Sequence, residues 1–315
     1  EFKTVTLKSW ASSWTHREVK KGSQLNDTIL TLILAVDQEI DYRRILYDDI
    51  LGKGQGTPTG NSLDKLQLAN GDVIDNYFYA SNRHYEQLEI DERYSVAGNV
   101  TLGSQTDTHK DNRAVAGILS SNGVGRAAFN AGTNRRVIPM ILREATCLSF
   151  DEVRDSNGIE TYISRDVERF DADGTVTTFK TECKTCHSFQ DQLYGAFVYY
   201  DVSAGSYPSI IYDFVDPVPA NNKMNKNILF AEGYIRRNSY WASEFTPAQL
   251  ELLGWPQERR EGFGAQSLGE AFANTEAFAS CQPKKAFAAV CGRPLHSTER
   301  DFLENLVQKI GRAHV

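Results

Sequence analysis

"TECKTCHSFQDQLYGAFVYYD", residues 181–201, contains a Cys-x-x-Cys-His run in a chain that has only five cysteines and six histidines. If this segment is helical, Cys183 and Cys186 lie on one face and His187 follows on the same turn. Covalent haem attachment of the c type requires two thiols that can add to the vinyl groups of a porphyrin, and an imidazole that can reach its iron. The spacing therefore predicts one covalently bound haem c, with His187 as the proximal iron ligand.

Two other kinds of site can use the same side chains. A zinc site needs a fourth ligand, which would have to come from another cysteine or a distant histidine, and no second Cys-x-x-Cys run is present. A thioredoxin-like redox pair would follow a strand in an alternating β/α pattern, which this sequence does not show. Haem is favoured, and a non-haem structural module held by zinc or disulfides is the alternative.

Composition narrows the class of protein further. The 315 residues are 41% hydrophobic and 24% charged, which is enough to bury a large core. The net charge of −7 and the lack of a clustered Lys/Arg face argue against a nucleic-acid partner. The longest apolar run, residues 28–36, is too short to cross a bilayer. We expect it to be a buried helix and expect no transmembrane segment in this fragment.

Apolar residues recur mainly at helical spacing, and strand-like alternation is rare. We therefore expect a mainly α protein with a helical, c-type cytochrome-like fold and long loops. Its expected regions are an N-terminal helical region (1–130), a haem-binding region (131–245) and a C-terminal helical domain (246–309). Helices are predicted near residues 27–36, 42–50, 73–88, 133–148, 175–187, 246–254, 267–280, 283–290 and 297–309, and loops at 51–62 and 203–227.

The last six residues, 310–315, read "IGRAHV". This is what a common short-read sequencing adapter encodes when it is translated. We expect these residues to be adapter read-through in an assembled fragment, so His314 is given no functional role.

The surroundings of the motif resemble the planctomycete-type secreted cytochromes, a family of poorly characterised domains shared with proteobacteria. The stretch "CKTCHSFQDQLYGAFVYYDVSAGSY" is similar to the family's C-x-x-C-H-x-x-x-D-P-L-G-x-A-x-x-x-x-D-x-x-G pattern, although Gln192 replaces its proline. Weaker similarities in order and spacing extend over most of residues 40–307. The residues that stand at the family's positions after the haem motif are Asp191, Gly195, Ala196, Asp201 and Gly205.

The resemblance implies a mono-haem cytochrome that carries single electrons in the cell envelope of a Gram-negative bacterium, in the periplasm or outside the cell. Its redox partner is unknown, and an acidic surface would favour a basic one.

A haem iron bound by His187 has a second axial position, and its occupant decides between electron transfer and chemistry on a bound molecule. The first candidate is His84, because it falls on a recurrent His-Tyr pair of the family. Met224 in a polar loop and Met140 in an apolar helical pattern follow in that order. An open position would instead indicate a peroxidase- or oxidase-like enzyme. We expect electron transfer.

Haem c is attached outside the cytoplasm, where disulfides persist. The cysteines outside the motif are Cys147, Cys281 and Cys291. Cys281 and Cys291 can bond only if Pro283 breaks the helix between them, because ten helical residues separate two positions by about 15 Å. A bridge from Cys147 to one of them is the alternative, and the sequence does not choose.

Overall fold

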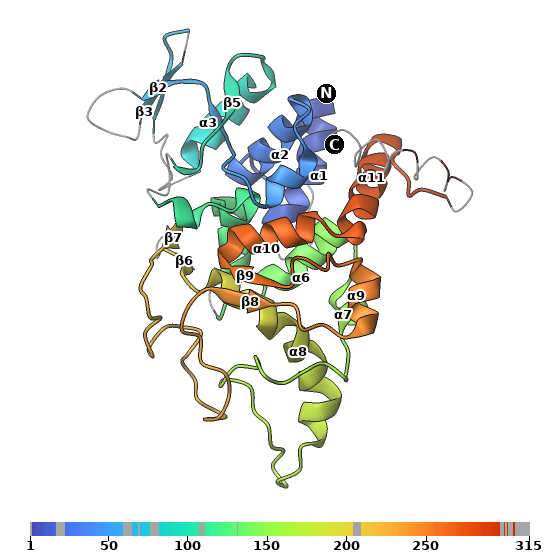
Figure 1. Ribbon diagram of the computed structural model, residues 1–315. Helices are drawn as coiled ribbons and strands as arrows, with labels where there is room; N and C mark the ends of the chain where they lie inside the picture. Colours follow the sequence, from blue (N-terminus) through green and yellow to red (C-terminus); the bar gives the residue numbers. More distant parts are fainter. Residues whose placement is uncertain are drawn as a thin grey trace.

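The computed structural model describes residues 2–16, 23–58, 65–68, 70–75, 82–106, 111–130, 132–203, 209–296, 299, 301 and 305. Helices dominate this part of the chain and are accompanied by short strands (Figure 1). The fold is therefore mixed but largely helical, and the expectation of a mainly α protein is met only in part. The α-helices are α1 (Lys8–Ala11), α2 (Asp27–Asp37), α3 (Arg83–Ile90), α5 (Asn122–Ala128), α6 (Val137–Ile141), α7 (Phe150–Val153), α8 (Lys184–Leu193), α9 (Pro247–Leu253), α10 (Gly264–Ala273) and α11 (Glu276–Cys291).

The strands pair antiparallel in small sheets, and they correct the two expected loops. Residues 51–62 contain two strands and residues 203–227 contain one, each only three or four residues long. Such short segments carry too few side chains to show alternation, and the first of them, residues 51–54, has its partner far away in the sequence. The pairs are β1 (Leu51–Gly54) with β5 (Val100–Gly103), β2 (Gly56–Pro58) with β3 (Lys65–Leu68), β3 with β4 (Val73–Asp75), β6 (Tyr200–Val202) with β7 (Ile210–Tyr212), and β8 (Tyr240–Ala242) with β9 (Glu261–Phe263).

The helix expected near residues 27–36 is confirmed as α2. Asn26 caps it by accepting a hydrogen bond of 3.0 Å from the backbone N–H of Ile29. Strand β1 packs directly on this helix, because Gly52 donates its N–H to Thr31 Oγ1 at 2.8 Å. A Cβ atom at Gly52 would lie 2.6 Å from the backbone nitrogen of Thr31, so this close approach requires glycine.

Helix α9 is also confirmed, with a capping box between Thr246 and Gln249. Helix α11 corrects a prediction, because it continues through Pro283 where a break was expected. Of the segment 42–50, only a 3₁₀ turn over Tyr42–Leu46 is helical. The segment 73–88 divides into β4 and α3, and residues 76–81 lie outside the described part.

The segment 133–148 forms α6 and a π-helical turn over Leu142–Thr146. Most of residues 297–309, and all of residues 310–315, lie outside the described part as well.

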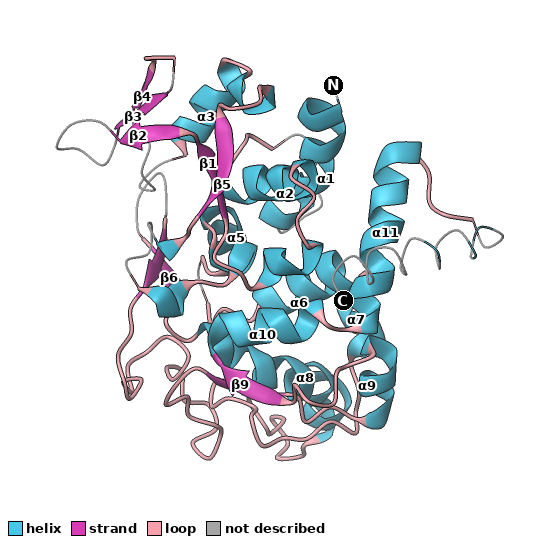
Figure 2. Cartoon of the chain, turned by 45° about the horizontal axis from the view of Figure 1, so that its top comes forward, coloured by secondary structure: helices cyan, strands magenta, loops and turns pink. Residues whose placement is uncertain are grey.

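One large hydrophobic core draws side chains from all three expected regions. A second, smaller cluster consists of Ile163, Val167 and Phe179, with Cys183 packed against it. Helix α8 lies among the loops at the lower end of the molecule in Figures 1 and 2, and it joins the two cores. Its Phe189 belongs to the large core, while the turn before the helix contributes Phe179 to the small one.

Candidate functional site

The three residues of the Cys-x-x-Cys-His motif lie on one continuous helical segment. A π-helical turn over Phe179–Cys183 runs directly into α8, which carries Cys186 and His187. Both thiols are partly buried and neither forms a disulfide. The structure thus brings the predicted residues together with both sulfur atoms free to react.

The imidazole of His187 is held by a carboxylate one helical turn further along α8. Its Nδ1 lies 3.2 Å from Oδ1 of Asp191, which is completely buried. An ionised carboxylate can only accept hydrogen bonds, so Nδ1 must donate and Nε2 is left to bind another group. The amide nitrogen of Gln190 is also 3.4 Å from Nδ1, but it is a donor too and cannot compete with the charged acceptor. Histidines that bind metal ions typically donate their other ring N–H to a carboxylate in this way.

Asp191 is kept ionised by its surroundings. Burial would raise the pKa of this carboxyl, but the charge of Arg135 and the contact with His187 outweigh it and hold the pKa well below its usual range. Arg135 donates to both carboxylate oxygens, at 2.7 and 3.0 Å, and the backbone N–H of Ser164 donates at 3.0 Å. Arg135 also forms two hydrogen bonds to Asp166, at 2.6 and 2.7 Å. One guanidinium therefore links Asp191, the partner of the histidine, to Asp166.

A cavity of about 400 Å³ lies beside the motif. It has the size of a small-molecule pocket. Phe179 belongs both to its wall and to the cluster that Cys183 contacts, so the cavity and the thiol share a neighbour. The walls combine apolar with charged side chains and include none of the three motif residues. They include Ile163, Phe170, Val176, Phe179, Phe230, Glu160, Arg169, Lys180 and Glu232.

His84, the first candidate for the opposite face of the iron, is not brought near the motif. It is buried on α3 against the ring of Tyr85. Helix α3 lies near the top of Figure 1 and α8 at the lower end. Tyr85 in turn donates its hydroxyl to the carbonyl of Gly52, so this helix packs on β1 and not on the motif. In this conformation His84 is not positioned to share an iron with His187.

The two methionines are also absent from the wall of the cavity. Met224 is buried in the large core and is anchored through its backbone N–H to the side chain of Asn222. Met140 is buried on α6 and borders a different hollow, next to His16 and Arg136. The sequence placed Met224 in a polar loop, and the structure buries its side chain in the large core.

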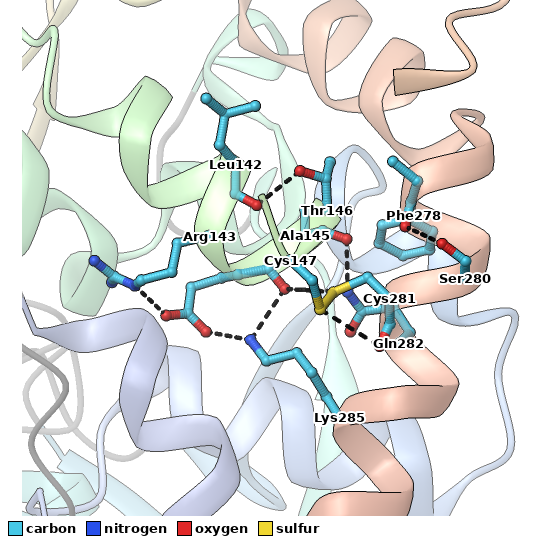
Figure 3. Close-up of a disulfide and its surroundings, with 12 residues drawn as sticks. Leu142, Arg143, Ala145, Thr146, Cys147, Phe278, Ser280, Cys281, Gln282 and Lys285 are labelled. Carbon is cyan, nitrogen blue, oxygen red and sulfur yellow. Dashed lines mark hydrogen bonds and ion pairs between the residues drawn. A yellow bond between two sulfur atoms is a disulfide. The ribbon is translucent and has the colours of Figure 1, made fainter. Parts of the chain in front are cut away.

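Two of the three cysteines outside the motif form a disulfide, and the sequence did not decide which two. Cys147 and Cys281 are joined by a disulfide with a Cα–Cα distance of 5.3 Å, and Cys291 is exposed and free. Figure 3 shows the bridge where the turn before Cys147 meets α11, next to Arg143 and Lys285. A Cys281–Cys291 bridge is excluded in this structure, because α11 is continuous between the two residues.

Sequence reasoning missed Arg135, Asp166 and Arg169. The four-residue spacing of His187 and Asp191 was a usable local signal, because it places two helical side chains together. The three missed residues come from loops or helix starts that no periodicity connects with the motif.

Within the described ranges, no group of three or more His, Cys, Asp and Glu side chains is placed to hold a metal ion. In the same part of the chain, no helix combines the length and the hydropathy needed to cross a membrane. Comparisons with protein-family models, with curated proteins and with solved structures found no match for this chain.

Proposed function

We propose that this chain is a mono-haem c-type cytochrome that transfers single electrons. In this proposal, the thiols of Cys183 and Cys186 hold the haem covalently and Nε2 of His187 binds its iron. One observation carries the proposal: two free thiols and an imidazole with a fixed hydrogen-bond partner share one helical segment.

The donor set fits a haem of this type. When bound, haem supplies reversible one-electron chemistry at its iron. Asp191 keeps the proton on Nδ1 of His187 and fixes the plane of the ring, since it is itself held by Arg135 and Ser164. Aromatic and charged side chains share the wall of the nearby cavity, and the polarity around a haem is one of the properties by which a protein sets its reduction potential.

We also propose that the protein acts in the cell envelope and is related to the planctomycete-type secreted cytochromes. The Cys147–Cys281 disulfide supports export to the periplasm or the outside of a Gram-negative cell. The net charge of −7 supports a basic redox partner, which would be steered to the acidic protein at low ionic strength.

The positions of two distal candidates favour a second function, a haem enzyme with an open distal position. His84 lies on α3, away from the motif, and Met224 is anchored in the large core. An iron held only by His187 would then keep one position for an external molecule, as peroxidases and oxygen-binding proteins do.

The test is production of the chain together with haem-attachment machinery. We expect haem that survives a denaturing gel in the parent protein and in C291S, which alters an exposed cysteine outside the motif. We expect its loss in the double variant C183A/C186A. A parent protein without covalent haem would refute both haem proposals. If haem is present, a reduced spectrum that ignores carbon monoxide supports electron transfer, and a spectrum that responds supports the open-site enzyme.

A further inference from the structure

A groove with a volume of about 620 Å³ runs between the first helical segment of the chain and α11. One wall is a face of α11 and of its C-terminal cap, because its members follow one another at the spacing of adjacent helical turns: Lys285, Ala288, Ala289 and Gly292. The facing wall comes from the helical residues 2–15 and consists of Val5, Thr6, Ser9, Trp10 and Ser13. The groove is therefore a space between two helical faces, and no residue of the Cys-x-x-Cys-His motif lines it.

One end of this groove is closed by the carboxylate of Glu144, which is only 2% exposed. Ser13 from one wall donates to Oε2 of Glu144 at 2.6 Å, and Lys285 from the other wall donates to the same oxygen. Val5 is eight helical residues before Ser13, so it lies about 12 Å from this end. Its side chain is 60% exposed. The groove thus has a charged, closed end and an open, apolar end.

The charges at the closed end do not balance. Among the described residues, the lining contains one carboxylate, that of Glu144, and two cations, Arg143 and Lys285, which both reach that carboxylate (Figure 3). Arg143 donates through Nε at 2.6 Å, but its Nη1 has no acceptor in the part of the chain that the structure describes. Burial lowers the pKa of the Lys285 amine against the charge of Glu144, and the charge of Arg143 lowers it further. One positive charge at this end is left without a counter-ion.

These features indicate a ligand with a single negative charge and an apolar tail. A carboxylate head matches the surplus of one positive charge and accepts charge-assisted hydrogen bonds from guanidinium and ammonium groups. A phosphate monoester carries nearly two negative charges, and the second would be repelled by Glu144. An alkyl tail would cover the exposed side chain of Val5 and the half-buried indole of Trp10, and removing such apolar surface from water is favourable.

We propose that this groove binds a fatty carboxylate of medium chain length. The head lies against Arg143 and Lys285, and the tail runs between the two walls toward Val5. This inference goes beyond the proposed function and does not depend on haem, so the failure of one leaves the other standing.

Titration calorimetry with decanoate, below its critical micelle concentration, tests the proposal. We expect saturable binding to the parent and none to A289W, because the added indole would fill the groove. A286W is the matched control, since Ala286 also lies on α11 but is exposed and outside the lining. It should bind decanoate as the parent does. Absence of saturable binding to the parent, or equal binding to A289W and A286W, would overturn the proposal.

The charge of the head group is tested separately, which keeps the proposal falsifiable if A289W does not fold. R143Q should bind decanoate about tenfold more weakly than the parent, because a hydrogen bond between charged groups is lost. R143K keeps the charge and should bind more tightly than R143Q. Decanol and decyltrimethylammonium, which have the same tail without the negative charge, should not bind to the parent. Equal affinities for decanoate and decanol, or an unchanged affinity in folded R143Q, would overturn the proposal.

Discussion

Nδ1 of His187 lies 3.2 Å from Oδ1 of Asp191, and the same oxygen accepts a hydrogen bond of 2.7 Å from Nε of Arg135. The histidine of the motif is therefore oriented by a segment far from it in the sequence. Arg135 extends the connection to Asp166, so the loop around residue 166 and the start of α6 meet behind the imidazole. A site that is local in sequence thus depends on long-range contacts for its geometry.

Replacing Asp191 by Asn should lower the free energy of unfolding by about 3 kcal/mol. This is the low end of the cost of breaking a buried ion pair, because Arg135 keeps its bonds to Asp166. Urea unfolding of the haem-free protein measures the change. The control is E182Q, an exposed carboxylate on the turn before α8, which should leave the stability almost unchanged. Equal midpoints for D191N and the parent would show that the pair contributes nothing.

The sequence predicted the elements whose structure depends on neighbouring residues alone. Helices α2 and α9 follow from a capping residue and an apolar period, and the helix of the motif follows from its spacing. It did not predict elements that form only through contacts with distant segments. Strand β1 exists because it pairs with β5 and packs on α2.

Helix α11 shows the same limit. It continues through Pro283 in a place where Cys281 is bonded to Cys147 and Gln282 donates to the carbonyl oxygens of Glu144 and Ala145. These contacts come from another segment and hold the helix directly before Pro283, while Lys285 donates to the carbonyl oxygen of Glu144 after it. The site divides in the same way, since Cys183 and His187 are readable from spacing while Arg169 reaches the cavity only through the fold.

The buried carboxylate of Glu144 should make the protein less stable in acid. Burial would raise its pKa, but the charge of Lys285 and hydrogen bonds from Lys285, Ser13 and Arg143 lower it below 4.5. The stabilisation is therefore complete above pH 4.5 and is lost as the pH falls through the lower pKa of the folded state. Urea midpoints measured between pH 3 and pH 7 should fall toward acid in the parent.

In E144Q the urea midpoint should fall less between pH 7 and pH 3 than in the parent, because the unfolded state no longer gains a proton at that position. Lys285 does not reverse the direction of this pH dependence. Burial lowers the pKa of its amine despite the opposing charge of Glu144, so the folded state does not bind an extra proton there. A parallel pH dependence in E144Q and the parent would contradict this assignment. The control E182Q should reproduce the parent curve.

Removing the Cys147–Cys281 bridge should destabilise the chain by about 2–5 kcal/mol. The bridge closes a loop across a sequence separation of 134 residues, so it removes many conformations from the unfolded state. The double variant C147A/C281A should therefore unfold at lower urea than the oxidised parent. C291S alters the exposed free thiol and should not. If reductant left the midpoint of the parent unchanged, the bridge would not be a stabilising element.

Replacing Gly52 by Ala should cost about 1–3 kcal/mol, the usual penalty of overpacking a core. The new methyl group would meet backbone atoms of α2, at 2.6 Å from the nitrogen of Thr31, and backbone cannot move aside cheaply. G103A in the partner strand β5 is the matched control. There the added atom would meet the flexible end of Lys53, which can rotate away. Thermal unfolding should separate the two variants, and equal losses would contradict the packing of β1 on α2.

The axial position opposite His187 gives the last prediction. Because His84 lies on α3 and neither Met224 nor Met140 lines the cavity, we expect the haem spectrum of H84Q, M224L and M140L to match that of the parent. H187A should change it strongly, since it removes the proposed proximal ligand. Leucine nearly conserves the volume of methionine, so any spectral change in M224L would report ligation and not collapse of the core. Such a change would mean that Met224 leaves the large core when haem binds, and its backbone anchor to Asn222 would have to break.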